Sequence, residues 1–320
     1  MKRWVKLLYA SATISLAAVA PAMADDVTLT YASAPSSSAY YKMGKQIAEA
    51  LKAGSNGEIS MVVNESEDYV DNVMQATEGA PNHMFSSHPV LVHLAQEGKA
   101  MFAGKGNGAF EEIRALFPIP SLTMQFVMEQ EAAVLEFDQL KGKKILLDNG
   151  TFAAREAAKY IKLFGLEGDV SIVDADLSEA ETKLKNGDID GFAIAGSWPT
   201  PEVSDIAMKT TVNLVTMTDD QVEKTKRARI VIPKGTYGGQ DDDIVTTSLP
   251  VVVYTTKAMD DETAYLVTKT FWEQMTQLRK EAGWWKGVDD TLMTNISGRL
   301  HPGSIKFYKE VGFPIAEDQQ

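Results

Sequence analysis

Between residues 145 and 215 the sequence alternates between short apolar runs of strand length and longer amphipathic runs of helix length. This alternation predicts a parallel sheet with helices on both faces, because each connection between parallel strands must cross over the sheet. The predicted strands are 145–147, 170–173, 189–195 and 212–215, and the predicted helices are 153–164, 178–186 and 202–208. This region is therefore expected to fold as an α/β unit.

The first part of the chain shows a similar order. Strands are predicted at 27–31 and 59–63, helices at 40–51 and 69–76, and a third strand is expected to end near residue 88. Two further strands, 113–117 and 123–128, are separated by Pro118 and Pro120, which predict a break between them. We expect the chain to cross into a second lobe at this point.

The segment 229–257 contains two β-rich runs on either side of a loop rich in glycine and aspartate. Such a segment can return the chain from the second lobe, and the predicted helix 260–282 then packs on the first lobe through Phe271, Met275 and Leu278. We therefore predict an α/β fold with two lobes, each a mainly parallel sheet flanked by helices, with a cleft and a hinge between them. Lobe 1 comprises residues 25–120 and 250–320, and lobe 2 comprises residues 121–249.

Residues 1–24 have the pattern of a cleaved signal peptide. Lys2, Arg3 and Lys6 precede an apolar stretch, and Ala22-Met23-Ala24 forms a small-residue cleavage site. The alternative, a membrane anchor, needs a longer apolar run than this one. We expect export to the periplasm, where a chain without cysteine relies on burial alone for its stability.

The chain is acidic, with a formal net charge of −13 at pH 7. Nucleic acid is bound through clustered lysines and arginines, and the sequence has no such cluster. The acidity is explained by solubility, and it leaves open an anionic ligand held by local groups. Nucleic acid is therefore not an expected partner.

Hydroxyl groups gather where predicted strands run into predicted helices. Ser36, Ser37 and Ser38 precede the helix that contains Tyr40, and Thr151 with Phe152 opens the first helix of lobe 2. Ligands of open α/β sheets bind beyond the carboxyl ends of the strands, and the free N–H groups of a helix start favour an anion there. The alternative is that one serine simply caps its helix.

Two larger side chains are further candidates. Arg155 lies in the first turn of the helix, where a cation opposes the helix dipole, so it could hold a ligand carboxylate or form a surface ion pair. Trp198 lies in a loop and could stack on a ligand or pack against a neighbouring helix. The sequence leaves both alternatives open.

Metal-dependent and nucleophilic chemistry lacks its usual motifs. The sequence contains neither G-x-S-x-G nor H-E-x-x-H, and His83, His88 and His93 are spaced by five residues, so they cannot share one helical face. We therefore predict no catalytic residues, no metal site and no cofactor.

The run P-x-G-T-Y-x-G-Q-D-x-D at residues 233–243, followed by Pro250, resembles the TAXI class of solute-binding subunits of TRAP transporters. Similar matches are Tyr40-Tyr41 with Gly44, Ser66 with Asn72, and His301-Pro302-Gly303 near the C-terminus. The resemblance extends from residue 31 to residue 312. Three features depart from the family pattern. Ser37 and Ser38 replace two glycines, Lys42 replaces a proline, and Phe152 follows Thr151 in a loop that is usually richer in glycine.

The resemblance implies a periplasmic binding protein that captures a small carboxylate, either glutamate-like or an oxo-acid, and delivers it to a TRAP permease. It adds Ser66 and the loop Ser86-Ser87-His88 to the candidate ligand-binding residues. The protein is expected to be a monomer that closes on its ligand. A sensory binding protein that reports to a membrane receptor remains the alternative, and a secreted enzyme on the same scaffold is a third.

Overall fold

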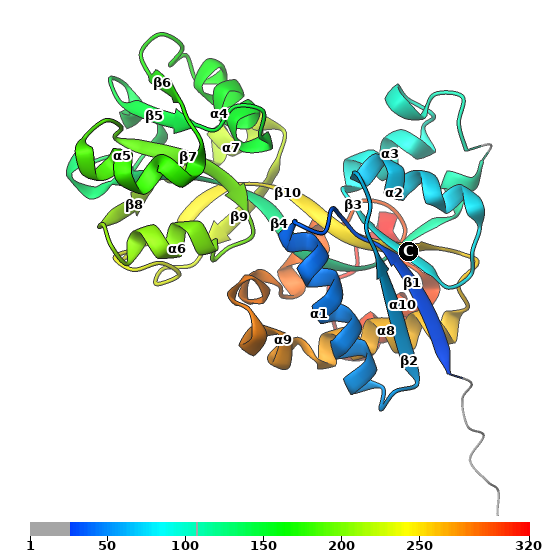
Figure 1. Cartoon of the computed structure of the whole chain (residues 1–320). Coiled ribbons are helices and arrows are strands. Elements are labelled where there is room, and N and C mark those ends of the chain that lie inside the picture. Colours follow the sequence, from blue (N-terminus) through cyan, green and yellow to red (C-terminus); the bar gives the residue numbers. More distant parts are fainter. Residues whose placement is uncertain (1–25, 107) are drawn as a thin grey trace, which may run out of the picture.

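The computed structural model describes residues 26–106 and 108–320, so the signal peptide predicted at residues 1–24 lies outside the described residues. The described chain forms two lobes joined by two long strands (Figure 1). These strands are β4 (Ile113–Glu129) and β10 (Ile244–Thr256), which pair antiparallel along most of their length. The lobe boundaries predicted near residues 120 and 250 fall inside them.

The first lobe is built on parallel strands. β1 lies between β2 and β3, and β3 pairs antiparallel with β10. The elements are β1 (Val27–Ala32), α1 (Ala39–Gly54), β2 (Ile59–Asn64), α2 (Tyr69–Gln75), β3 (His83–Ser87) and α3 (Pro89–Gln96). The parallel arrangement explains why the loops after all three strands open on the same edge of the sheet.

The second lobe contains the predicted alternation. β5 pairs parallel with both β6 and β7, as the alternation requires. The elements are β5 (Lys144–Leu147), α4 (Phe152–Leu163), β6 (Ser171–Asp174), α5 (Ala180–Asn186), β7 (Gly191–Gly196), α6 (Pro201–Ala207), β8 (Val212–Leu214), α7 (Asp219–Thr225) and β9 (Ala228–Ile232). β7 and β8 pair antiparallel with β4, and β9 with β10, so the sheet is mixed.

The break predicted at Pro118 and Pro120 was wrong, because β4 runs through both prolines as one strand. A proline lacks the N–H that a central strand needs, so it is tolerated only where one neighbour is missing. β4 begins to pair with β7 only at Thr123, and before that point β10 is its main neighbour. The prolines thus lie where β4 is nearly an edge strand.

The C-terminal helices return to the first lobe. α8 (Asp261–Glu273) and α9 (Met275–Glu281) replace the single helix predicted at 260–282, and α10 (Pro302–Val311) packs on α8. The break falls at Gln274, whose ψ of 0° departs from the helical range. Phe271 is buried and stacks on Phe117 of β4 with ring centroids 3.9 Å apart. This stacking anchors β4 in the core of the first lobe.

Each lobe has buried apolar clusters of its own. The chain passes between the lobes in β4 and β10, which we call the hinge strands. Among residues 26–106 and 108–320, no helix is long and apolar enough to cross a membrane.

Candidate functional site

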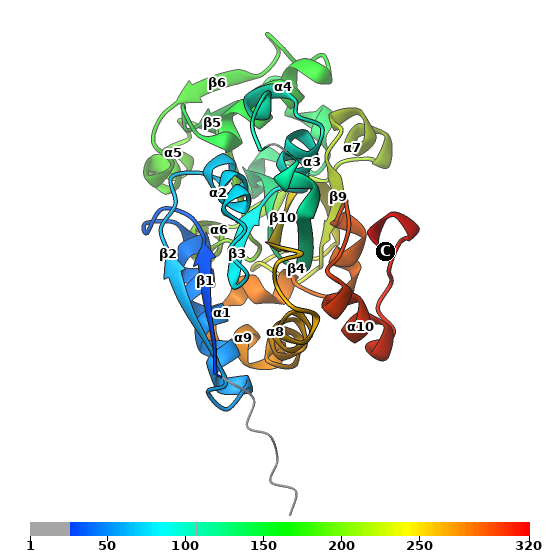
Figure 2. The same cartoon turned by 90° about the vertical axis from the view of Figure 1, so that its right-hand side faces the viewer.

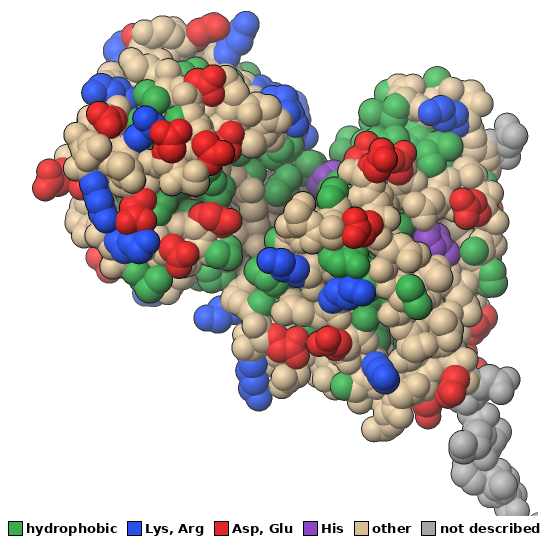
Figure 3. All heavy atoms as spheres, in the orientation of Figure 1, with side chains coloured by type: hydrophobic (Ala, Val, Ile, Leu, Met, Phe, Trp, Pro, Cys, Tyr) green, Lys and Arg blue, Asp and Glu red, His purple; other side chains and the backbone are tan. Residues whose placement is uncertain are grey.

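A cavity of about 550 Å³ lies between the two lobes, and we call it the cleft cavity. The space-filling view shows the hollow between the lobes (Figure 3). The first lobe supplies the start of α1, with Ser37, Ser38, Tyr40 and Lys42, together with Trp284. The second lobe supplies the start of α4 and the end of β7, with Asp148, Thr151, Phe152, Ser197 and Glu202.

Two helices with side-chain caps begin at the cleft cavity, and α6 begins there without one. Ser38 caps α1 by accepting a hydrogen bond from the Tyr40 backbone N–H at 3.1 Å. Thr151 caps α4 in the same way, accepting from Ala154 N–H at 3.2 Å, and its own hydroxyl donates to the Asp148 carbonyl at 2.6 Å. The remaining first-turn N–H groups have no intrahelical acceptor, so both helix starts favour an anion in this cavity.

A cluster of aromatic side chains lies beside the cleft cavity on the first lobe, and Tyr40 is the member that lines the cavity. Tyr40 and Tyr69 meet edge to face at 6.2 Å, and Tyr69 meets His88 at 4.5 Å. Tyr40 and Tyr69 line a neighbouring cavity of about 330 Å³, which shares Ser38, Tyr40 and Leu122 with the cleft cavity. Burial raises the pKa of both tyrosine hydroxyls, which therefore stay protonated and act as hydrogen-bond donors.

His88 follows β3 as the N-cap residue of α3 and contacts Tyr69, but it is not among the residues that line these two cavities. Its Nδ1 lies 2.8 Å from the carbonyl oxygen of Pro250 in β10. Burial lowers the pKa of His88 to about 4, so the ring is neutral near pH 7. Because a carbonyl can only accept, Nδ1 carries the proton and Nε2 is an acceptor.

The other predicted serines hold the loops together. Ser86 and Ser87 are buried, and their hydroxyls donate to the carbonyls of Ser33 at 3.3 Å and Tyr69 at 3.2 Å. Ser66 donates to the Asp68 carbonyl at 3.0 Å. None of these three serines is among the residues that line the two cavities just described, and neither is the exposed Ser36.

Arg155 and Trp198 also lie outside the linings of these two cavities. Arg155 is exposed on α4, and its Nη1 donates to the Gly150 carbonyl at 2.8 Å. Trp198 packs against core residues of both lobes and lines a separate cavity of about 400 Å³. A Cβ at Gly287 would lie 3.0 Å from its ring, so Trp198 is closely covered there.

The lining residues that were not candidates from the sequence include Trp284, Asp148, Glu202 and Lys42. Trp284 follows α9, and its indole N–H donates to Gln46 Oε1 at 3.1 Å. Asp148 and Glu202 lie in the stretch from the end of a strand to the first turn of the next helix in the second lobe, as Thr151 does. Lys42 follows the tyrosine pair at the start of α1. The cavity thus combines one cation and two carboxylates with two helix starts.

Several solved structures are similar to this chain. A substrate-binding domain assigned to a molybdenum ABC transporter of Clostridium difficile is 17% identical, with a TM-score of 0.48, over 79% of this chain and 96% of that one. Substrate-binding domain 2 of Lactococcus lactis GlnP, in its open conformation, is 12% identical, with a TM-score of 0.47, over 84% and 96%. A TRAP periplasmic solute-binding protein of Xanthobacter autotrophicus with bound β-D-galacturonate is 15% identical, with a TM-score of 0.37, over 89% and 87%.

A family model, described as the NMT1-like family, matches residues 31–312 and so spans both lobes and the cleft between them. The chain belongs to the NMT1-like family, a family of solute-binding proteins of the periplasmic type and not of enzymes.

Proposed function

We propose that this protein is the periplasmic solute-binding subunit of a TRAP transporter of the TAXI class, and that it captures a small organic acid. The motif at residues 233–243 and the expected signal peptide support this transporter class. The observation that carries the ligand class is the cleft cavity, where two helix starts from different lobes face one space.

A carboxylate suits the helix starts. The first turns of α1 and α4 offer backbone N–H groups and the positive ends of two helix dipoles, and Lys42 adds a full charge from the first lobe. Closure of the lobes would bring both helix starts onto the same anion and exclude water, which strengthens each charge-assisted hydrogen bond.

A glutamate-like amino acid fits this cavity better than a plain oxo-acid. Asp148 and Glu202 line the second-lobe side, and two carboxylates would repel an anion that had no compensating positive group. An α-amino group supplies that positive charge. The aliphatic part of such a ligand would lie against Phe152, Leu122 and Trp284.

Isothermal titration calorimetry with L-glutamate and 2-oxoglutarate tests this assignment. We expect L-glutamate to bind more tightly, and we expect Asp148→Asn with Glu202→Gln to weaken glutamate binding about tenfold while leaving 2-oxoglutarate binding unchanged or stronger. Glu223→Gln, an exposed change on α7, is the matched control. Tighter binding of 2-oxoglutarate by the wild-type protein would contradict the amino-acid assignment.

The transporter class is tested separately. Proteoliposomes that contain a TRAP permease should take up the bound acid in the presence of this protein when an ion gradient is imposed, without ATP. Uptake that requires ATP hydrolysis by a different permease would overturn the TRAP assignment and leave the ligand assignment intact.

A further inference from the structure

A second cavity of about 400 Å³ lies on the opposite side of the hinge from the cleft cavity, and we call it the rear cavity. In Figure 2, α1 and α6 lie to one side of β4 and β10, whereas α7 and the C-terminal segment lie to the other. The rear cavity is lined by α3, by the turn between α7 and β9, by residues 248–250 of β10, and by residues 295–298. It therefore touches both lobes and the hinge strand itself.

The rear cavity has a lysine and an arginine in its lining, although the protein as a whole is acidic. Lys226, Arg227 and His93 line it, and no carboxylate is among its lining residues. The Arg227 guanidinium donates two hydrogen bonds to the Glu156 carboxylate, at 2.6 and 2.8 Å. The Nε2 of the exposed His93 lies 3.4 Å from Oε1 of Glu97. Lys226 is exposed and forms no ion pair with the part of the chain that the structure describes. Its positive charge is therefore available to an anion.

A buried hydroxyl without a partner also lines the rear cavity. Ser248 is 1% exposed, and its Oγ has no hydrogen-bond partner among the described residues. A buried polar group without a hydrogen bond costs free energy, so an unpaired hydroxyl at a cavity wall indicates a missing partner. A bound oxyanion would accept a hydrogen bond from this hydroxyl.

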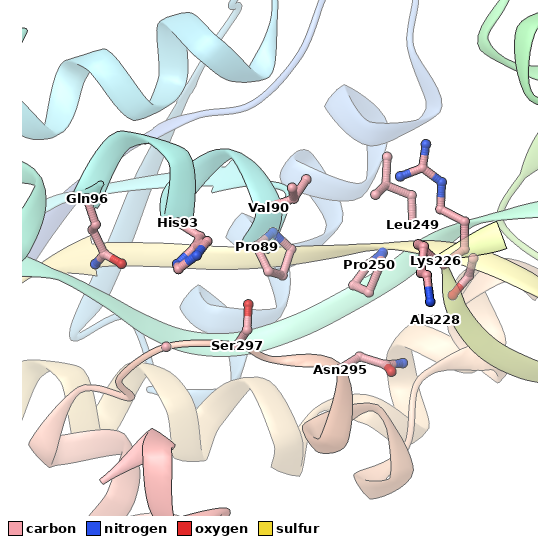
Figure 4. Close-up of a pocket in the computed structure, with 13 residues that line it drawn as sticks. Pro89, Val90, His93, Gln96, Lys226, Ala228, Leu249, Pro250, Asn295 and Ser297 are labelled. Carbon is pink, nitrogen blue, oxygen red and sulfur yellow. The ribbon is translucent and has the colours of Figure 1, made fainter. Parts of the chain in front are cut away.

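Polar groups on the first lobe complete the site. Figure 4 shows the Ser297 hydroxyl pointing toward α3 and the Asn295 amide pointing toward the side that carries Lys226. The lining of the rear cavity therefore offers hydrogen-bond donors from the first lobe as well as Lys226 from the second. An anion bound by donors of both lobes would tie the first lobe to the second behind the hinge.

We propose that the rear cavity is a binding site for a small oxyanion, of the phosphate or carboxylate type, which changes the relative position of the lobes. When two lobes rotate about a hinge, the gap on one side widens as the gap on the other side narrows. A ligand that fixes the distance between the lobes at the rear cavity therefore also limits how far the cleft cavity can open or close. This proposal is independent of the solute that the cleft cavity takes.

Calorimetric titration with inorganic phosphate and with succinate, at constant ionic strength maintained with sodium chloride, tests the site. At least one of the two anions should bind saturably to the purified protein. Ser248→Ala and Lys226→Gln should each weaken that binding at least about fivefold, because each removes one donor. Lys224→Gln makes the same change of charge on an exposed residue of α7 that does not line the cavity, and it should bind like the wild type.

A cleft variant separates the two cavities. Ser37→Ala changes only the cleft cavity, so it should leave the rear-cavity binding unchanged. Absence of saturable binding of both anions, an unchanged affinity in Ser248→Ala, or an equal loss in Lys224→Gln and Lys226→Gln would each overturn the site. Small-angle scattering of the wild type should show a different radius of gyration with the bound anion, and an unchanged radius would overturn the effect on the lobes.

Discussion

The imidazole of His88 and the carbonyl of Pro250, 162 residues apart in the chain, are joined at 2.8 Å where the first lobe meets the hinge strand. This contact ties the end of β3 and the start of α3 to β10. It also places a buried, neutral ring beside Tyr69 and within electrostatic range of Arg227 from the second lobe. The neutrality of His88 therefore matters for stability.

Acidification should destabilise the fold through His88. Burial lowers the pKa of His88 from 6.5 to about 4. Between these two pH values the ring is protonated in the unfolded chain but neutral in the folded protein, so acidification favours unfolding. The stability from this group is complete above pH 6.5 and is lost as the pH falls toward about 4, by roughly 3 kcal/mol in all. Burial also lowers the pKa of His83 and His301, which act in the same direction.

Urea unfolding of wild type and His88→Gln at about pH 7 and about pH 4.5 measures this contribution. The variant should lose less free energy of unfolding than the wild type between the two values. His93→Gln, an exposed change, should keep the wild-type difference. Equal pH dependence in wild type and His88→Gln would show that the ring is not held neutral by the fold.

The ion pair between Arg227 and Glu156 should be costly to break from one side. Glu156 is 7% exposed, and although burial raises its pKa, the hydrogen bonds and charge of Arg227 lower the pKa overall. Arg227→Met leaves a buried carboxylate whose remaining cation is Lys159 at 4.0 Å among the described residues, and we expect a loss of about 3 kcal/mol.

The double variant Glu156→Gln with Arg227→Met removes both charges. It should recover most of that loss, because no buried charge then lacks a partner. Urea denaturation of the wild type, the two single variants and the double variant gives the coupling energy. A double variant that is as unstable as the sum of the single variants would show that the pair contributes through packing alone.

The sequence predicted the site best where its signals are local. α1 and α4 begin within one residue of their predicted starts, because Ser38 and Thr151 are capping residues that precede an amphipathic pattern. The parallel pairing of β5 with its neighbours also followed from alternation. These features depend only on residues that are near one another in the chain.

The missed features depend on contacts between distant segments. Pro118 and Pro120 are accommodated in β4 because β7 starts to pair farther along, and no local pattern contains that information. Trp284 reaches the cleft cavity because the C-terminal helices return to the first lobe, where Gln46 of α1 holds its indole. Trp198 packs against the cores of both lobes for a similar reason, since the residues that cover it come from η7 (Gly283–Gly287).

Alanine variants of Ser37 and Ser38 should distinguish a helix-capping role of the loop before α1 from a ligand-binding role. Ser38 accepts the hydrogen bond from Tyr40 N–H, so Ser38→Ala should cost about 1 kcal/mol of stability. Ser37 lines the cleft cavity without capping the helix, so Ser37→Ala should change stability by less than about 0.5 kcal/mol. Both changes should weaken L-glutamate binding in calorimetry. A loss of affinity in Ser38→Ala only, in proportion to its lost stability, would indicate that this loop serves as a cap and does not contact the ligand.

The role of Arg155 depends on closure of the lobes. Its exposed guanidinium donates to the Gly150 carbonyl, and the next residue in that loop, Thr151, lines the cleft cavity. Near the start of α4 a cation opposes the helix dipole, and a ligand carboxylate would relieve that repulsion. Arg155→Ala should therefore leave the stability of the empty protein within about 0.5 kcal/mol and weaken L-glutamate binding about tenfold.

Lys162→Ala on the same helix is the matched control, because it removes an exposed positive charge from the other end of α4. Calorimetry at two salt concentrations distinguishes a direct contact between Arg155 and the ligand from long-range attraction by positive charge. Salt screens the long-range attraction, and its loss would weaken binding in both variants. Equal affinities in the wild type and Arg155→Ala would place Arg155 outside the closed site. The helix starts and Lys42 would then hold the carboxylate without it.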